Sequence, residues 1–390
     1  MYRGRTSPRA VADRLALAGT GIALTGFGVA LYNRVAVRRL AVGITIVEPV
    51  TVCIPARDEA DRLPALIGDL RAQLGVADLR VLILDDGSAD GTGPAAAAAI
   101  GSDPRFLMIR SEDEPAPGWT GKAAACARLA DLVDTAALVF LDADVRLGPG
   151  AIAAAVHELR RREVALVSPW PAQRVGSTAE ALVQPLLCWS WATTLPVTVA
   201  NRTRRPSMAL ACGQFLVFDT AAYRAVGGHG AIAASPTEDL DIARALRRGG
   251  RHTALVAAGR QAETRMYRGA TELDAGYTRW LWSAYGGSPF AALAVGAIAV
   301  LAYWVPPLVA LGGSGRTRRI GFAGYAAAVA GRLLARSTET ATGLTRTDAL
   351  AALAHPVSVG AYVMLSLRSH RARRLGNLVW KGRRLRQPPD

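Results

Sequence analysis

Two aspartates directly follow an apolar run near the middle of the chain. Residues 136–141 read Ala-Ala-Leu-Val-Phe-Leu, and Asp142-Ala143-Asp144 come next. An uninterrupted apolar run is typical of a strand buried in a parallel sheet, and open α/β sheets bind ligands beyond the carboxyl ends of such strands. A D-x-D turn at this point can aim both carboxylates at one hard cation. The pair predicts a site for a metal-bound diphosphate; helix capping by the same aspartates is the alternative interpretation.

Polar residues also follow two earlier apolar runs. Pro55-Ala56-Arg57-Asp58-Glu59 comes after residues 50–54, and Asp85-Asp86-Gly87-Ser88 comes after residues 80–84. A carboxylate at a strand end accepts hydrogen bonds from a ribose or a base N–H, and a glycine there permits a close turn. Each segment alone is also an ordinary turn sequence. Together with the central aspartates, they predict three acidic strand ends along one sheet edge.

Strand and helix patterns alternate through this region. Short apolar runs predict strands, and apolar residues at helical spacing or alanine-rich stretches predict helices. The expected strands are residues 50–54, 80–84, 106–109, 136–141 and 164–168, and the expected helices are residues 60–72, 93–100, 151–161 and one beginning at Gly121. This alternation predicts an α/β fold with a doubly wound, mostly parallel sheet.

Apolar segments flank the predicted sheet on both sides. The chain has 390 residues, 51% of them hydrophobic, and a mean hydropathy of +0.20, which is high for a wholly soluble protein. Residues 15–33 and 289–311 carry no charge and are long enough to span a bilayer. Residues 320–335 are shorter and contain an arginine, and residues 349–367 are interrupted by His355-Pro356. We therefore expect an N-terminal transmembrane anchor and C-terminal transmembrane helices.

Four parts of the chain follow from these segments. They are a basic segment with the membrane anchor (residues 1–47), the α/β domain (48–287), the membrane helices (288–367) and a basic tail (368–390). The net charge of +15 gathers near both ends, where Arg3, Arg5 and Arg386 are examples. Basic clusters beside membrane segments face the anionic cytoplasmic leaflet, and no zinc-finger spacing or stacking pattern indicates a nucleic-acid partner. We expect a multi-pass protein of the plasma membrane with a cytoplasmic α/β domain.

The number of crossings is in conflict with this topology. If the α/β domain and the basic tail share the cytoplasm, an even number of crossings must separate them, yet three apolar segments follow Gly287. One of the three therefore fails to cross. The short segment at residues 320–335 and the proline-broken segment at residues 349–367 are both candidates.

Four motifs of the α/β domain, in this order and spacing, resemble glycosyltransferase family 2, whose members have the GT-A fold. They are residues 52–59, 84–88 and 141–144 and Thr237-Glu238-Asp239, and the resemblance covers residues 50–285. Pro117-Gly118-Trp119-Thr120-Gly121-Lys122 is similar to the branch associated with carotenoid and hopanoid glycosylation. The tail pattern of His355-Pro356 followed by Trp380-Lys381-Gly382-Arg383 is similar to the same branch.

The resemblance implies a nucleotide-diphosphate sugar donor, taken here to be a UDP-sugar, and inversion at the anomeric carbon. By the same resemblance, Pro55 and Glu59 line the nucleoside pocket and Asp86 contacts the base. Asp142 reaches the ribose side, and Asp144, with Asp142, binds Mn²⁺ or Mg²⁺ bridging the diphosphate oxygens. Such an ion stabilises the leaving nucleotide.

The acceptor side follows from the last motif. The resemblance assigns Asp239 as the base that takes the acceptor proton, because an alcohol is a weak nucleophile near neutral pH. Glu238 lies beside it, and Gln214 precedes an apolar strand that forms a wall near Asp239. Alternatively, Glu238 and Asp239 are only N-terminal charges of a helix over residues 240–248.

Lys122 does not belong to a phosphate loop of the Walker type. Ala116 stands where that motif needs its first glycine, and Ala123 replaces its Ser/Thr. A lysine at the start of a helix can still face the donor phosphates, since the helix N-terminus also favours an anion. A solvated surface lysine is the other interpretation.

Residues 276–280 depart from the Q-x-x-R-W motif of polymer-forming family members. Gly276 stands in place of the glutamine, while Arg279 and Trp280 are retained. Single-sugar transfer is therefore the better expectation. We assign Arg279 to the diphosphate and Trp280 to the acceptor; an interfacial aromatic belt is the alternative for Trp280.

The segment at residues 179–199 is unusually apolar for the middle of an enzyme domain. It is interpreted as an interfacial surface that admits a lipid acceptor of the polyprenyl, carotenoid or hopanoid type, or else as core packing. The sequence thus predicts a membrane-bound enzyme that glycosylates a lipid. Two alternatives remain: a phosphotransferase similar to the haloacid dehalogenases, with Asp142 as its nucleophile, and a non-catalytic membrane scaffold.

Overall fold

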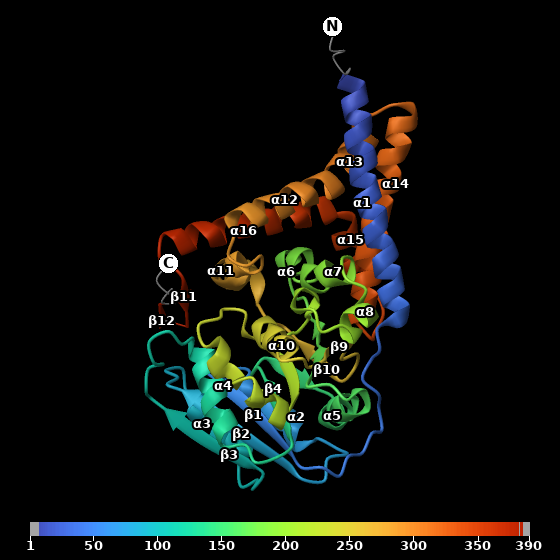
Figure 1. Ribbon diagram of the computed structural model, residues 1–390. Coiled ribbons are helices and arrows are strands. Elements are labelled where there is room, and N and C mark those ends of the chain that lie inside the picture. Colours follow the sequence, from blue (N-terminus) through green and yellow to red (C-terminus); the bar gives the residue numbers. More distant parts are fainter. Residues whose placement is uncertain (1–7, 382, 385–390) are drawn as a thin grey trace. The chain divides into compact units, whose positions relative to one another are not determined.

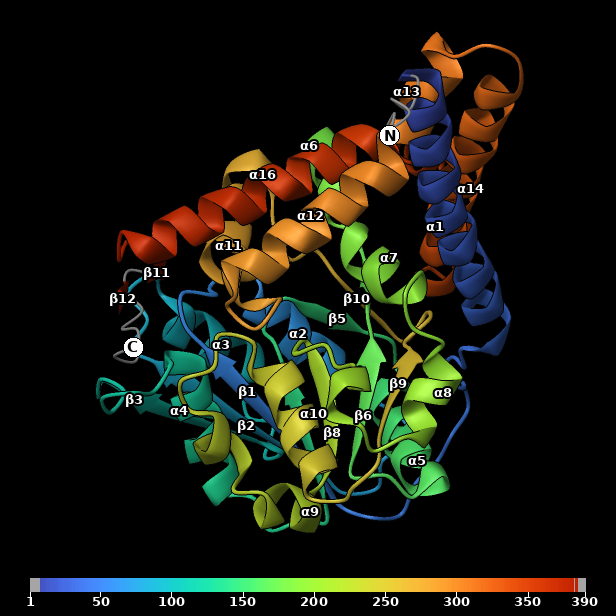
Figure 2. The same ribbon diagram turned by 45° about the horizontal axis from the view of Figure 1, so that its top comes forward.

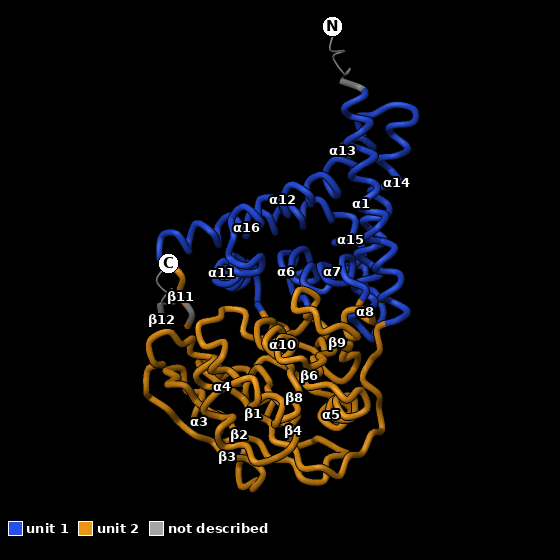
Figure 3. The backbone as a smooth tube through the Cα atoms, in the orientation of Figure 1, with its two compact units in different colours: residues 1–36, 175–196, 267–377 blue, residues 37–174, 197–266, 378–390 orange. Residues whose placement is uncertain are grey.

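The computed structural model describes residues 8–381 and 383–384, which form two compact units. Arg3, Arg5 and Arg386 of the expected basic ends lie outside the described residues. The sheet unit comprises Val37–Arg174, Val197–Met266 and the tail from Leu378, and the helical unit comprises the remaining segments (Figure 3). Both units are discontinuous in sequence. In particular, Val175–Pro196 interrupts the sheet unit in sequence and belongs to the helical unit.

The sheet unit is built on a seven-stranded sheet, counted over the described residues, with the order β3-β2-β1-β4-β8-β6-β9. Its strands are β1 (Val50–Ala56), β2 (Leu79–Asp86), β3 (Phe106–Ser111), β4 (Ala137–Leu141), β6 (Leu166–Trp170), β8 (Phe215–Asp219) and β9 (Thr253–Ala257). Strand β8 is antiparallel to both of its neighbours, and the other pairs are parallel. The expected α/β fold with a mostly parallel sheet is confirmed.

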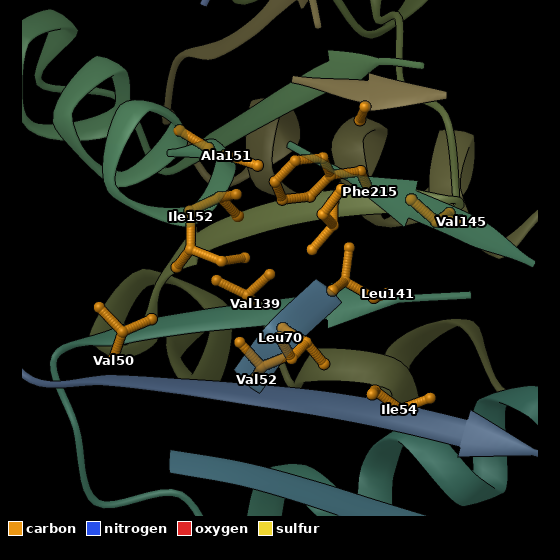
Figure 4. Packing of buried hydrophobic residues seen from close by; sticks show 14 of the residues in the cluster. Val50, Val52, Ile54, Leu70, Val139, Leu141, Val145, Ala151, Ile152 and Phe215 are labelled. Carbon is orange, nitrogen blue, oxygen red and sulfur yellow. The ribbon is translucent and has the colours of Figure 1, made fainter. Parts of the chain in front are cut away.

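Helices cover both faces of this sheet (Figures 1 and 2). They are α2 (Leu63–Arg71), α3 (Thr92–Ile100), α4 (Gly121–Asp131), α5 (Ala151–Arg162), α8 (Val197–Arg202), α9 (Thr220–Ala225) and α10 (Glu238–Arg248). On one face, Val52, Val139 and Phe215 pack against buried residues of α2 and α5 (Figure 4). On the other, alternate residues such as Phe140 and Leu216 pack with α4, α9 and α10. Strand side chains alternate between faces, so one run of apolar residues fills both cores.

The observed bounds of α2, β2 and α10 differ from the expected ones by a few residues. Helix α2 begins at Leu63 rather than at residue 60, because Pro64 occupies the first helical turn, where no N–H is required. Helix α10 begins at Glu238 rather than at residue 240. Strand β2 extends to Asp86, so both of its aspartates belong to the strand itself.

Two smaller sheets complete the sheet unit. Strands β5 (Val145–Leu147), β7 (Ala172–Gln173) and β10 (Ala262–Thr264) form one, in the order β5-β10-β7. Strands β11 (Val379–Trp380) and β12 (Arg383–Arg384) form an antiparallel hairpin in the tail. In the three-stranded sheet, β5 begins directly after Asp144, so its pairing with β10 fixes the end of the D-x-D turn.

The helical unit contains only helices among its described residues. They are α1 (Pro8–Ala36), α6 (Thr178–Val183), α7 (Leu186–Ala192), α11 (Gly269–Trp280), α12 (Pro289–Tyr303), α13 (Val305–Gly312), α14 (Gly315–Glu339), α15 (Arg346–Leu353) and α16 (His355–Arg374), with one described 3-10 helix at Leu281–Ser283. Helix α1 lies beside α14, and α12 lies beside α16, and these two pairs run in different directions (Figures 1 and 2). The Thr20 hydroxyl of α1 donates to Ile320 O of α14 at 3.0 Å.

Two helical stretches of the described chain are long and apolar enough to cross a membrane, Ala10–Ala36 and Pro289–Gly312. The expected interruption at His355-Pro356 is confirmed, since α15 and α16 meet there at an angle of 74°. Together these two helices are a third candidate only as one bent span. Helix α14 covers the segment at residues 320–335 but is not among the candidates.

The apolar segment at residues 179–199 is largely internal. Trp191 is 4% exposed, and Trp189 packs edge-on against the rings of Tyr303 and His355, with centroid distances of 5.1 and 4.8 Å. Cys188 is fully buried. The core-packing interpretation of this segment therefore holds for its tryptophans.

Candidate active site

The carboxyl ends of β1, β2 and β4 meet at one edge of the main sheet, because these strands are parallel. Strand β8 runs the opposite way, and its register places Phe215 beside Leu141. The residues just before β8 therefore lie beside those just after β4, and the N–H of Asp142 donates to Gln214 O at 3.1 Å. The first turns of α4 and α10 bring further polar side chains to this edge.

Lys122 connects the donor motif to the acceptor motif. It is the second residue of α4, whose N-cap is Thr120. Its Nζ lies 2.7 Å from Asp142 Oδ1 and 2.7 Å from Glu238 Oε1. Despite burial, which favours the neutral amine, these two carboxylates raise the pKa of Lys122 well above its ordinary value. The interpretation of Lys122 as a solvated surface lysine is wrong.

Asp239 is held by two backbone donors. The N–H of Gly213 donates to its Oδ2 at 2.7 Å, and the N–H of Leu240 donates to its Oδ1 at 2.7 Å. A Cβ at Gly213 would lie 3.2 Å from both Lys122 Nζ and Glu238 Oε1, so only glycine fits there without displacement. Burial raises the pKa of Asp239 to about 6, and the charge of Glu238 adds to the rise. A carboxylate with this pKa is a competent general base near neutral pH.

Glu238 and Asp239 occupy the first turn of α10, where negative charge is favoured. Burial alone would raise the pKa of Glu238, but the Lys122 ammonium lowers it below its ordinary value. Glu238 and Asp239 can therefore be both the N-terminal charges of a helix and residues of the site, because the start of α10 positions their carboxylates at the edge of the main sheet.

Asp144 carries a buried oxygen with unmet hydrogen-bonding capacity. Within the described part of the chain its Oδ1 has no hydrogen-bond partner. Burial raises the pKa of Asp144 to about 7, with contributions from the carboxylates of Asp142 and Glu59. A divalent cation would satisfy this oxygen and stabilise its ionised form, so the residues fit such an ion. Among the described residues, no group of three or more His, Cys, Asp or Glu side chains that could hold a metal ion is found.

The loops after β1 and β2 are joined by hydrogen bonds. The N–H of Asp58 donates to Ser88 Oγ at 2.9 Å, and the N–H of Ala89 donates back to Asp58 Oδ1 at 2.9 Å. The N–H of Glu59 donates to Thr92 Oγ1 at 2.7 Å. These bonds place Glu59, assigned to the nucleoside pocket, next to the end of β2, where Asp86 lies.

Two arginines of this region were not among the predicted site residues. Arg57 donates to Asp86 O, and its Nη1 lies 4.0 Å from Asp86 Oδ2. Arg62 Nη1 lies 3.5 Å from Glu59 Oε2. The position of Arg57 between Pro55 and Glu59 was the available signal, since a strand-end loop that binds an anionic nucleotide needs positive charge. Pro55 itself is half-buried at the end of β1.

Gln214 lies inside the wall of the site. Its side chain is 2% exposed, and its Oε1 accepts from Gln173 Nε2 at 2.8 Å and from Cys212 Sγ at 3.3 Å. Through its backbone carbonyl it holds the turn at Asp142. Its assignment to the acceptor side stays a prediction.

Arg279 and Trp280 lie on α11 of the helical unit, whereas the sheet-edge residues belong to the sheet unit. Trp280 packs against Tyr277, with ring centroids 5.3 Å apart. A Cβ at Gly276 would overlap the ring of Tyr267, so a glutamine at this position would require Tyr267 to move. The roles of Arg279 and Trp280 toward donor and acceptor stay predictions.

Comparisons with known proteins concern the family and the fold of the chain. Residues 51–227 match the family model of glycosyl transferase family 2. A 4,4'-diaponeurosporenoate glycosyltransferase of Staphylococcus haemolyticus (strain JCSC1435) is 28% identical over 243 residues. The matched region spans 60% of this chain and 62% of that relative, which is less than two thirds of the relative's length.

A solved structure is similar over nearly the whole chain. The mannosyltransferase of Pyrobaculum calidifontis, crystallised with GDP-Man and Mn²⁺, superposes with a TM-score of 0.59 at 17% sequence identity. The similarity covers 92% of this chain and 98% of the mannosyltransferase. At this identity the similarity concerns the fold, and it confirms the expected GT-A architecture.

Proposed function

We propose that this chain, whose residues 51–227 form a glycosyl transferase family 2 domain, is an inverting glycosyltransferase that moves one sugar from a nucleotide-diphosphate sugar to a lipid. The observation that carries the proposal is the Lys122 bridge between Asp142 and Glu238. It brings the proposed donor-binding turn beside Asp239, the proposed base. A transferase needs these two functions at one place.

On the donor side, the loops after β1 and β2 bind the nucleoside and the D-x-D turn faces the diphosphate. Asp144 and Asp142 would hold Mn²⁺ or Mg²⁺, and the unpartnered oxygen of Asp144 supports this assignment. When bound, the ion supplies positive charge that stabilises the leaving nucleotide. Lys122 holds Asp142 in place and adds a second positive charge at the same position.

On the acceptor side, Asp239 takes the proton from the attacking hydroxyl. Its two backbone hydrogen bonds fix the carboxylate in one orientation. Its pKa of about 6 leaves it ionised at neutral pH yet basic enough to accept a proton. Direct attack by the acceptor on the anomeric carbon gives inversion.

The lipid acceptor and the membrane location rest on the helical unit. Two stretches in it are long and apolar enough to cross a membrane, and one relative is named for a carotenoid acid. We propose a protein of the plasma membrane with the sheet unit in the cytoplasm. Because the tail from Leu378 belongs to the sheet unit, the number of crossings between residues 288 and 377 must be even. If Pro289–Gly312 crosses the membrane, a second segment must cross back, and this is either α14 or the bent α15–α16 pair. Otherwise Pro289–Gly312 lies along the membrane surface and does not cross.

The phosphotransferase alternative is not favoured. It requires Asp142 as a nucleophile, whereas Asp142 is paired with Lys122 directly after β4, within the region that matches the family 2 model. The scaffold alternative gives no reason for the raised pKa values of Asp144 and Asp239 at one edge.

The test is transfer itself. Membranes containing the protein are incubated with Mn²⁺ and a panel of radiolabelled nucleotide sugars, and labelled lipids are separated and identified. Asp239→Asn is expected to abolish labelling. Asp241→Asn is the matched control, because Asp241 lies on the same helix turn but pairs with Arg244 and Ser235. Equal labelling by the Asp239→Asn variant, or efficient transfer to water-soluble acceptors only, would contradict the proposal.

A further inference from the structure

The tail of the chain returns to the loop that follows β1. Lys381 follows β11 directly and lies 322 positions from Glu59, and its Nζ lies 2.5 Å from Glu59 Oε1. The same ammonium donates to Arg57 O and to Asp58 O. In return, Arg57 Nε donates to the carbonyl of Lys381 at 3.3 Å. All of these residues belong to the sheet unit (Figure 3).

The ammonium donates hydrogen bonds to three consecutive residues of this loop. A lysine has three N–H donors, and here three acceptors on consecutive residues receive them. Both partners adopt a backbone conformation that is uncommon without glycine, with φ of 50° at Asp58 and 43° at Lys381. Such conformations persist where surrounding contacts hold them. The contact therefore fixes the loop in one shape.

This loop belongs to the proposed donor site. Its hydrogen bonds connect Asp58 and Glu59 to the residues after β2. The carboxylate of Glu59 would repel an anionic diphosphate, and Lys381 and Arg62 together offset that charge.

We propose that Lys381 is a positioning residue for donor binding: it fastens the C-terminal tail to the loop Arg57–Glu59 and so holds the nucleoside pocket in its binding shape. This inference rests on the proposed function, because it takes Glu59 to be part of the donor site. It assigns a role in the catalytic unit to a segment that follows the last helix of the helical unit. Lys381 thereby supports the donor site from a position after the last described helix of the chain.

The experiment compares Lys381→Met with Arg374→Met in the full-length protein. Arg374 is an exposed basic residue at the end of α16, so its replacement removes the same charge without touching the loop. Binding of UDP and of GDP, each with Mn²⁺, is measured by calorimetry. Hydrogen exchange of the amides at residues 57–60 is measured without nucleotide.

Lys381→Met is expected to weaken nucleotide binding roughly 10- to 100-fold, as for lost hydrogen bonds to a charged group, and to accelerate exchange at residues 57–60. Arg374→Met should do neither. The KM for the lipid acceptor should stay near the parent value. Unchanged affinity together with unchanged exchange in Lys381→Met would overturn the inference.

A double variant separates positioning from direct contact. If Lys381 acts through the loop, its effect and that of Glu59→Gln on nucleotide affinity will not add. Additive losses would mean that Lys381 touches the nucleotide itself, which overturns the positioning role. A parent protein that binds neither nucleotide contradicts the proposed function and the donor role with it, while the exchange measurement still decides whether Lys381 holds the loop.

Discussion

Both units bury charged side chains, but they pair these charges differently. In the helical unit, Arg336 bonds to Asp348 at 2.8 Å and also to Glu339, and all three are buried. Arg332 donates to two backbone carbonyls, Ala181 O at 2.9 Å and Leu182 O at 3.0 Å. These partners are supplied entirely by the protein.

At the edge of the main sheet, Asp142 and Glu238 are paired with Lys122, but Asp144 and Asp239 are not compensated in this way. Asp144 keeps a buried oxygen without a partner among the described residues, and the pKa values of Asp144 and Asp239 are raised to about 7 and about 6. Paired buried charges support structure, whereas uncompensated ones at a sheet edge are typical of a site that awaits a ligand. Substitutions of the buried ionic group should therefore lower the stability of the helical unit, whereas substitutions at the sheet edge should lower activity.

The largest effect is expected from Asp239→Asn. Loss of the base should lower the rate of transfer to a hydroxyl acceptor roughly 10²- to 10⁴-fold, while donor binding and the melting temperature stay near parent values. Steady-state kinetics, calorimetry with nucleotide and thermal denaturation in detergent measure the three quantities. A large loss of donor affinity with normal turnover at saturation would instead assign Asp239 to the donor site.

Arg336→Met should have the opposite signature. Removing one member of a buried ionic group leaves Asp348 and Glu339 unpaired, at a cost of about 3–5 kcal/mol in stability. Protein that remains folded should keep its KM for donor, because α14 belongs to the helical unit. Thermal denaturation in detergent measures the first effect and kinetics the second. A melting temperature equal to that of the parent would remove the contrast between the units.

Asp144→Asn is expected to weaken binding of nucleotide with Mn²⁺ roughly 10- to 100-fold, because one charged ligand is lost. Its effect on stability should be favourable or absent. The folded pKa of about 7 lies above the unfolded value, so ionisation of Asp144 destabilises the fold progressively between about pH 4 and pH 7. Asparagine removes that penalty, and a melting temperature measured at pH 8 without metal should not fall. Equal nucleotide affinity with a chelator and with Mn²⁺ in the parent would contradict the metal assignment.

The smallest expected effect is the dependence of the transfer rate on pH. Transfer to a hydroxyl acceptor requires ionised Asp239, so at saturating donor and Mn²⁺ the rate should fall about tenfold per pH unit below about pH 6. Above that value the rate should be level. The residual rate of Asp239→Asn should lack this dependence. A parent rate that stays level down to pH 5 would count against Asp239 as the base.

The site could be predicted from the sequence wherever one strand or one helix start places a residue. Asp142 and Asp144 follow an apolar run, and that run is indeed β4. The start of a helix at Gly121 was likewise expected and is confirmed. The sequence did not show, however, which carboxylates pair with Lys122. Its two carboxylates come from the turn after β4 and from the start of α10, two segments far apart in sequence that only the tertiary fold brings together.

By itself, the sequence determined the alternation of strands and helices, the acidic strand ends at Asp86 and Asp142, and the long apolar segments. These depend on local periodicity, which requires no knowledge of partners. The tertiary structure alone decided that β8 enters the sheet antiparallel and so brings Gly213 to Asp239. It also decided that Val175–Pro196 packs with the distant helices and that Lys381 returns to Glu59. Such contacts join residues far apart in the chain, and their energies depend on which surfaces meet, which no local pattern contains.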